Sequence, residues 1–228
     1  MENTQQGLTA PKGQIKSKER VSAHGEVFTA DREVNAMLDL VKQETERIDS
    51  RFLEPACGNG NFLAKILERK LVVTRNHYRQ SRTEYELQSL IAVGSLYGIE
   101  IQQDNVTECQ ERLFDIFRQA YTSLFLDAKA EDYLKSIRYV LSRNILWGDA
   151  LTLMTPDGVG PIIFSEWSPV GYQVKRRDFT LDMLLRNQPM EGPNLFSDLG
   201  EEAFIPTPFR EFPLIHYSKI HSHADREL

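Results

Sequence analysis

Apolar side chains recur along most of this chain every three or four residues, and short apolar runs interrupt that spacing. The spacing is typical of amphipathic helices, and the short runs are typical of buried strands. Helices are predicted at 31–41, 61–67, 72–94, 104–117, 132–141 and 180–186. Strands are predicted at 51–53, 96–101, 144–147 and 161–164. Asp31 and Asp104 stand where helix N-caps are expected.

Strands that alternate with helices predict βαβ units and a parallel sheet. We therefore expect an α/β fold, a Rossmann-like, doubly wound and mostly parallel sheet that is truncated at its C-terminal strands. Right-handed crossovers place the carboxyl ends of all strands at one edge, where such sheets bind ligands.

Three regions follow from the same pattern. Residues 1–20 lack periodicity and are expected to be a flexible arm, and 21–187 form the predicted domain. Residues 188–228 are a tail rich in proline and aromatic residues, with one expected strand at 214–217. No internal repeat is visible.

Composition narrows the class of protein. Hydrophobic residues make up 41% and charged residues 26% of the 228, as in ordinary soluble domains. No apolar run is long enough to span a bilayer, no secretory signal begins the chain, and two cysteines offer no disulfide framework. We expect a cytoplasmic protein without membrane contact. The net charge of −6 provides no general attraction to nucleic-acid phosphates.

The most informative segment is the turn between the first strand and the helix after it. Glycines at 58 and 60 let the backbone approach a ligand, and the helix N-terminus offers N–H groups to an anion. Leu63 replaces the third glycine of a dinucleotide fingerprint, and the Gly-Lys-Ser/Thr of a phosphate loop is missing. The turn residues predicted to contact a ligand are Glu54, Pro55, Ala56, Cys57, Gly58, Gly60 and Phe62.

Two acidic residues end the next two predicted strands. Glu100 can accept hydrogen bonds from both hydroxyls of a ribose, and Asp149 can accept one from the exocyclic amine of adenine. Ile101 can pack on the adenine face, and Ala150 follows in the same site. Either acid alone is more often a solvated loop residue. Both acids beside a glycine turn predict a nucleoside pocket.

These segments resemble adenine-specific DNA methyltransferases of restriction–modification systems. LEPACGNGNFL (53–63) resembles their motif I, and YGIEI (97–101) and NILWGDAL (144–151) resemble their ribose and adenine motifs. GEVFTADREVNAML (25–38) is similar to the preceding motif, although Ala30 replaces a usual proline. The resemblance covers about 18–165 and implies S-adenosylmethionine as cofactor, no metal, and contact of Phe28 and Thr29 with its methionine end.

The acceptor motif departs from the family pattern. In the family, the fourth strand ends in Asn/Asp/Ser-Pro-Pro-aromatic, which clamps a flipped base. Here Ser165, Glu166, Trp167 and Ser168 take that place without either proline. A second register starts at Ser168-Pro169 and brings Tyr172 near the site. Ser165 or Glu166 could supply the oxygen that accepts a hydrogen bond from the amine of the base, and Trp167 or Tyr172 could supply the ring on which the base stacks. Alternatively, Trp167 packs in the core and no base is bound.

The tail adds little chemistry. About 40 residues follow Asn187, too few for the remaining strands and a recognition domain together. His216, His221 and His223 lack partners at ligand spacing and are expected in a solvated tail, not in a metal site. The sequence thus predicts a methyltransferase subunit that acts on adenine in DNA through a partner or specificity subunit. Two alternatives remain: a non-catalytic regulatory or assembly subunit that binds the cofactor, or a methyltransferase acting on a small molecule or protein.

Overall fold

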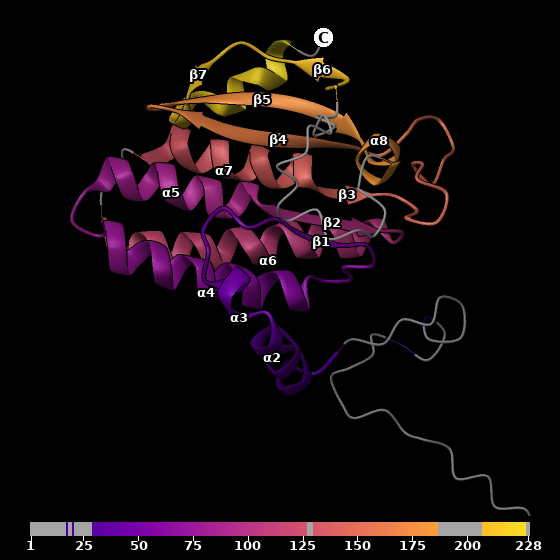
Figure 1. The fold of residues 1–228 in the computed structure, drawn as a ribbon, viewed down its shortest axis with the longest axis horizontal. Coiled ribbons are helices and arrows are strands. Elements are labelled where there is room, and N and C mark those ends of the chain that lie inside the picture. Colours follow the sequence, from indigo (N-terminus) through magenta and orange to yellow (C-terminus); the bar gives the residue numbers. More distant parts are fainter. Residues whose placement is uncertain (1–16, 18–19, 21–28, 127–129, 187–206, 227–228) are drawn as a thin grey trace, which may run out of the picture.

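A computed structural model of the chain describes residues 17, 20, 29–126, 130–186 and 207–226 (Figure 1). The helices are α2 (Asp31–Leu40), α3 (Lys42–Thr45), α4 (Asn61–Tyr78), α5 (Arg82–Gly94), α6 (Gln103–Thr122), α7 (Glu131–Asn144), α8 (Leu181–Arg186) and the 3-10 helix η3 (Tyr217–Arg226). The strands are β1 (Phe52–Glu54), β2 (Leu96–Glu100), β3 (Ile145–Trp147), β4 (Ile163–Val170), β5 (Gln173–Thr180), β6 (Arg210–Glu211) and β7 (Ile215–His216).

The first three strands form a parallel sheet in the order β1-β2-β3. Glu54, the last residue of β1, lies opposite Gly98, and Glu100 at the end of β2 lies opposite Trp147 of β3. The carboxyl ends therefore meet at one edge, as parallel pairing requires. The α/β prediction is confirmed for this sheet and its helices.

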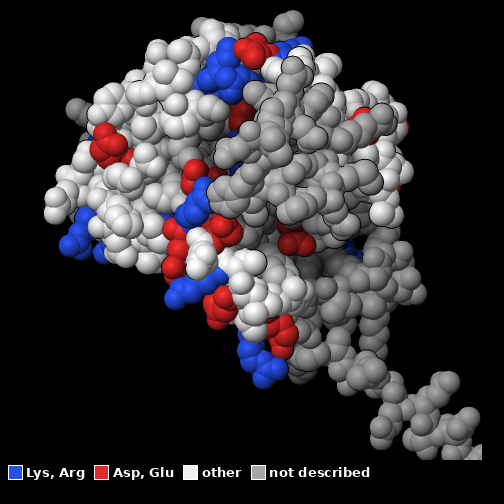
Figure 2. Space-filling model, in the orientation of Figure 1, with Lys and Arg blue, Asp and Glu red and all other residues white. Residues whose placement is uncertain are grey.

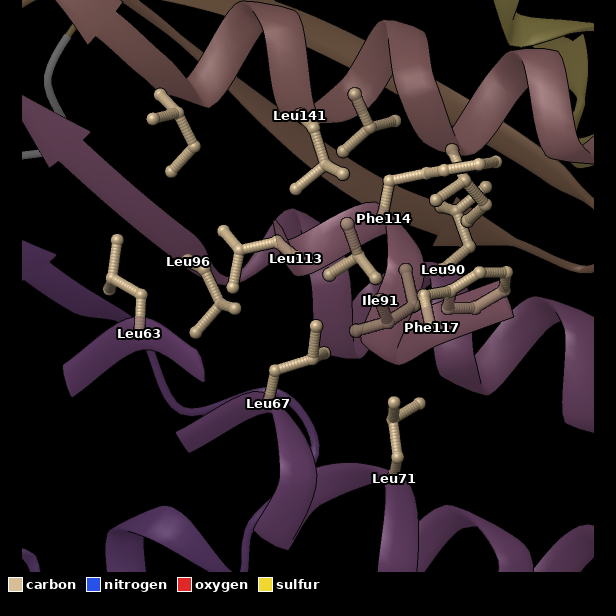
Figure 3. Close-up of a cluster of buried hydrophobic side chains, with 14 of the residues drawn as sticks. Leu63, Leu67, Leu71, Leu90, Ile91, Leu96, Leu113, Phe114, Phe117 and Leu141 are labelled. Atoms are coloured by element: carbon tan, nitrogen blue, oxygen red, sulfur yellow. The ribbon is translucent and has the colours of Figure 1, made fainter. Parts of the chain in front are cut away.

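The core fills the space between this sheet and α4 to α7. Ten side chains labelled in Figure 3 contribute to one apolar cluster: Leu63, Leu67, Leu71, Leu90, Ile91, Leu96, Leu113, Phe114, Phe117 and Leu141. In α6, Cys109, Leu113 and Phe117 are fully buried and recur every four residues, as the periodicity predicts. Each fully buried leucine or phenylalanine contributes about 1.5–3 kcal/mol relative to an exposed one.

The prediction of a fourth parallel strand at 161–164 is wrong. β4 begins at Ile163 and continues through Ser165–Ser168 to Val170, where a turn at Gly171 (φ 58°) leads into β5. β4 and β5 pair antiparallel in a second sheet, which β6 and β7 join through β5. This sheet lies across α5 and α7 (Figure 1).

Buried charged side chains explain why the sequence pattern does not predict β5. The residues of β5 that face inward include Arg176, which is fully buried, and Asp178, which is 4% exposed. Arg176 donates to both oxygens of Asp178, from Nε to Oδ1 and from Nη2 to Oδ2, each at 2.8 Å. The buried side of the strand is therefore polar, and no alternation of apolar and polar residues reveals it.

Helix boundaries also differ from those expected. The helix expected at 72–94 begins only at Arg82, because residues 72–78 belong to α4, which continues to Tyr78. Ser81 caps α5 by accepting from the Glu84 N–H. Asp31 and Asp104 lie in the first turns of α2 and α6, not at the N-caps. Acidic residues there still interact favourably with the helix dipole.

The C-terminal residues 207–226 pack against the domain. β7 confirms the strand expected at 214–217, and η3 lies along α7. The buried carboxylate of Glu86 accepts from the hydroxyls of Tyr217 (2.7 Å) and Tyr121 (2.5 Å). His221 is half-buried with Nδ1 at 3.1 Å from Ser136 Oγ, so a fully solvated tail is wrong for this residue. The side chain of His223 and residues 188–206 lie outside the described part.

Candidate functional site

The glycine turn after β1 is fastened to the end of β2. Cys57 N–H donates to the carbonyl of Ile99, and Gly58 N–H donates to Oε2 of Glu100, both at 2.9 Å. Gly58 (φ 53°) and Gly60 (φ 85°) have left-handed backbone conformations that favour glycine. The observed conformation of the turn is therefore supported by its own glycines and by hydrogen bonds to β2.

Gly60 has a second reason to be glycine. A Cβ at this position would lie 2.6 Å from Sγ of Cys109 on α6, which no side chain tolerates without a shift. From the sequence, both glycines are expected to let the backbone lie close to a ligand. The structure adds close packing between α6 and the start of α4 as the constraint at Gly60.

Glu100 joins two backbone segments at the carboxyl edge of the sheet through hydrogen bonds. Its side chain is 8% exposed, and its two oxygens accept from backbone N–H groups: Oε2 from Gly58 and Oε1 from Gln102 at 2.8 Å. A carboxylate has about four acceptor positions, so the two backbone hydrogen bonds use about half of its acceptor capacity. Ile101 follows with a half-exposed side chain, and its carbonyl accepts from the Trp147 indole N–H at 2.9 Å.

Asp149 follows β3 and shapes the next loop. Its Oδ1 accepts from Leu151 N–H at 2.9 Å, and its own N–H donates to the Met154 carbonyl at 2.9 Å. Among the described residues, none donates to its Oδ2. Leu153 has a left-handed backbone (φ 62°), an uncommon conformation for a leucine, and Ala150 is half-buried in the same loop.

Glu54 ends β1 with a half-buried side chain. Burial raises the pKa of this carboxyl above its ordinary value. Pro55 and Ala56 are exposed at the start of the turn, and Phe62 is half-buried against the core. Of the two residues expected at the methionine end, Phe28 lies outside the described part, and Thr29 accepts a hydrogen bond from Asn61 Nδ2 at 2.9 Å.

The predicted acceptor residues lie inside the antiparallel hairpin. Ser165 is fully buried, and its Oγ donates to Asp178 Oδ1 at 2.7 Å and accepts from Arg176 Nε at 3.1 Å. Trp167 is 6% exposed and packs on Gly94, where a Cβ would lie 2.9 Å from the indole. The interpretation of Trp167 as a core residue is confirmed.

Glu166 and Ser168 face outward from β4. Glu166 forms ion pairs with Arg51 and, at 3.4 Å, with Arg177. Ser168 is half-buried and lines a polar hollow of about 590 Å³ together with Arg51 and Trp167. The structure thus brings Glu54, Glu100 and Asp149 to one edge, and it holds 165–168 in a strand that does not pair with β1.

Three residues that hold the turn were not identified from the sequence: Asn61, Glu108 and Arg112. Glu108 Oε1 accepts from Asn59 Nδ2 at 3.1 Å, and Arg112 Nη1 donates to Asn61 Oδ1 at 2.5 Å. Their spacing places 108 and 112 one helical turn apart on α6, beside the buried Cys109, but it does not reveal their partners in the turn.

Surface charge, metal-binding clusters, membrane-spanning helices and similarity to known proteins bear on what this site can do. On the face shown in Figure 2, basic and acidic side chains are intermixed. Within the described ranges, no His, Cys, Asp and Glu side chains cluster in a way that could hold a metal ion. No helix in the described part is both long and apolar enough to cross a bilayer. No family model, curated protein or solved structure matches the chain.

Proposed function

We propose that this chain is an S-adenosylmethionine-dependent methyltransferase subunit with a Rossmann-like sheet, related in activity to adenine-specific DNA methyltransferases of restriction–modification systems. The supporting observation is the hydrogen bond from Gly58 N–H to Glu100, with Asp149 at the end of the neighbouring strand. Parallel α/β sheets bind nucleotides at this edge, where a glycine turn and a carboxylate meet the sugar.

The residues present fit an adenosylated amino acid. Glu54 is a half-buried carboxyl with a raised pKa, and a ligand ammonium is a suitable counter-charge for it. Asp149 Oδ2 is available to an exocyclic amine, and the half-exposed Ile101 offers an apolar surface to a purine. Gly58 carries no side chain and has a left-handed backbone, so a ligand could approach the backbone of the turn at this position.

Bound S-adenosylmethionine supplies an electrophilic methyl group on a sulfonium that leaves as a neutral thioether. The chain contributes binding and orientation, which by themselves lower the barrier of a bimolecular transfer. Glu100 and Asp149 would fix the nucleoside, and Glu54 the amino-acid end. The acceptor we propose is the amine of adenine in DNA, in a cytoplasmic setting.

A partner or specificity subunit would supply the DNA contacts in this proposal. The formal charge of −6 gives this chain little general attraction to a phosphate backbone. One observation favours a second candidate, a non-catalytic subunit that retains the cofactor site. Ser165 and Trp167 are buried within the hairpin, so neither can hold a flipped base in this conformation.

Titration calorimetry with S-adenosylmethionine tests the proposal. We expect micromolar binding, about −8 kcal/mol, that is weakened in Glu100→Ala and retained in Arg118→Ala, an exposed control on α6. Absence of binding by the folded wild-type protein would refute both candidates. A tritiated-methyl assay on DNA, with and without a co-purified partner subunit, then separates the catalytic candidate from the non-catalytic one.

A further inference from the structure

Helix α6 holds the glycine turn with consecutive side chains of one face. Cys109 Sγ limits Gly60, Glu108 accepts from Asn59 Nδ2 at 3.1 Å, and Arg112 Nη1 lies 3.5 Å from the Asn59 carbonyl oxygen. These contacts come from a 20-residue helix whose buried residues, including Leu113 and Phe117, are packed in the core. The turn therefore rests on α6 as well as on β2.

Arg112 also fixes the orientation of the Asn61 side chain. Its Nη1 donates to Asn61 Oδ1 at 2.5 Å, and Asn61 Nδ2 donates to the Thr29 carbonyl at 2.9 Å. A guanidinium has only donors and a carbonyl is only an acceptor, so one orientation of the amide satisfies both neighbours. The position of the amide thus depends on Arg112.

This relay reaches the segment that precedes α2. Thr29 stands immediately before Ala30, the N-cap of α2. The N-terminal part of the chain also contacts α6 directly, where Arg20 donates to both oxygens of Asp104 at 2.6 and 3.2 Å. Asp104 lies four residues after Glu100, the proposed ribose acceptor.

We propose that Arg112 is a positioning residue for the cofactor site: through Asn61 it holds the Thr29 carbonyl, and the backbone before α2, against the glycine turn. The inference rests on the proposed function, because the ligand whose site is prepared is S-adenosylmethionine. Arg112 itself contacts no ligand. Its effect is preorganisation, which improves affinity by reducing the ordering that binding would otherwise require.

The competing explanation is that Arg112 and Asn61 act only as a strut, a contact that joins α6 to α4 without positioning Thr29. The variant Asn61→Asp distinguishes this strut from the proposed relay to Thr29. An aspartate keeps an oxygen for Arg112 but replaces the donor to Thr29 with a second oxygen. A strut predicts unchanged affinity in this variant, whereas a relay predicts a loss like that of Arg112→Ala. Because an added carboxylate could repel the carboxylate of the ligand, the titration is repeated with 5′-methylthioadenosine, which has none.

The experiment uses the full chain and the variants Arg112→Ala, Arg112→Lys, Asn61→Asp and Arg118→Ala. We expect S-adenosylmethionine affinity to fall about fivefold to tenfold in Arg112→Ala and Asn61→Asp, consistent with loss of one hydrogen bond. Arg112→Lys should recover part of the loss, and Arg118→Ala should match wild type. Wild-type affinity in Arg112→Ala, or in Asn61→Asp with both ligands, would overturn the proposal.

Hydrogen exchange on the ligand-free protein provides an independent measurement. Peptides covering Thr29 and the start of α2 should exchange faster in Arg112→Ala and in Asn61→Asp than in wild type or Arg118→Ala. Unchanged exchange there overturns the relay whether or not the cofactor binds. Faster exchange in a protein that binds no S-adenosylmethionine would instead support the relay and refute the proposed function.

Discussion

The N–H of Gly58 and the Oε2 of Glu100 are 2.9 Å apart, and their hydrogen bond joins the turn after β1 to the end of β2. Glu100 also accepts from the N–H of Gln102, so one buried carboxylate satisfies two backbone donors from different segments. It therefore has a role in the fold before any ligand binds.

Glu100→Ala should lower both cofactor affinity and stability. Removing the carboxylate leaves two backbone donors without their acceptor, which costs about 1–3 kcal/mol of folding free energy. Loss of the proposed ribose acceptor should weaken S-adenosylmethionine by a similar amount. Urea unfolding and titration calorimetry measure the two effects. If affinity is unchanged in the folded variant, Glu100 does not contact the ligand.

Glu54→Gln should have opposite effects on stability and binding. Burial raises the pKa of Glu54, so the folded state favours its protonated form, and its contribution to stability is lost as pH rises through the folded-state pKa. The neutral amide removes this loss, and the variant should melt about 1–3 °C higher than wild type at pH 7. The difference should disappear below pH ~4.

The affinity of Glu54→Gln for S-adenosylmethionine should fall, because the amide carries no charge to pair with the ligand ammonium. Equal melting temperatures at both pH values would contradict the desolvation argument.

Gly60→Ala should destabilise the fold through α6. The new Cβ meets Cys109 Sγ at 2.6 Å and the backbone is left-handed, which together should cost about 2–4 kcal/mol. Gly158→Ala is the matched control, because Gly158 is also left-handed (φ 70°) but has nothing within 4 Å of a Cβ. A double-mutant cycle with Cys109→Ala isolates the contact. Additive effects of the two substitutions would show that the contact does not limit Gly60.

The purified chain alone should methylate DNA weakly or not at all. Ser165 and Trp167 are buried, and 165–168 form part of an antiparallel strand instead of the loop after a parallel one. Glu166→Gln should leave cofactor affinity unchanged and cost about 1 kcal/mol of stability, since the partners Arg51 and Arg177 are 61% and 37% exposed and the amide can still accept from them. A tritiated-methyl assay measures the activity. Robust, sequence-specific methylation by the wild-type chain would contradict this prediction. If Glu166→Gln abolished that activity, Glu166 would be the residue that accepts the hydrogen bond from the base amine.

The parallel part of the fold was predictable because its signals are local. Apolar runs at 52–54, 96–100 and 145–147 each follow a helix or precede a glycine turn, and their pairing follows from alternation with helices. The same signals identified Glu54, Glu100 and Asp149. No long-range information was needed to bring these residues to one edge.

The hairpin was not predictable, because its polar inner face depends on a partner distant in sequence. Arg176 and Asp178 satisfy each other and Ser165, so their burial shows only when β4 and β5 are already paired. Arg112 was missed for a related reason. Its role depends on Asn61, 51 residues earlier, and helical periodicity does not reveal such a contact.

The contact between Tyr217 and Glu86 spans 131 residues and has a consequence for synthesis on the ribosome. Glu86 is 5% exposed, and Tyr217, one of its donors, is translated 131 residues after it. A nascent chain that ends before Tyr217 already has Arg82 and Tyr121 as donors to this carboxylate, but it lacks the donor that Tyr217 supplies to Oε2. It must bury this oxygen without that hydrogen bond or leave it hydrated, and losing a hydrogen bond to a buried charge is unfavourable. The helical layer should therefore complete its packing only after the C-terminal segment has left the ribosome, although β1 to β3 emerge much earlier.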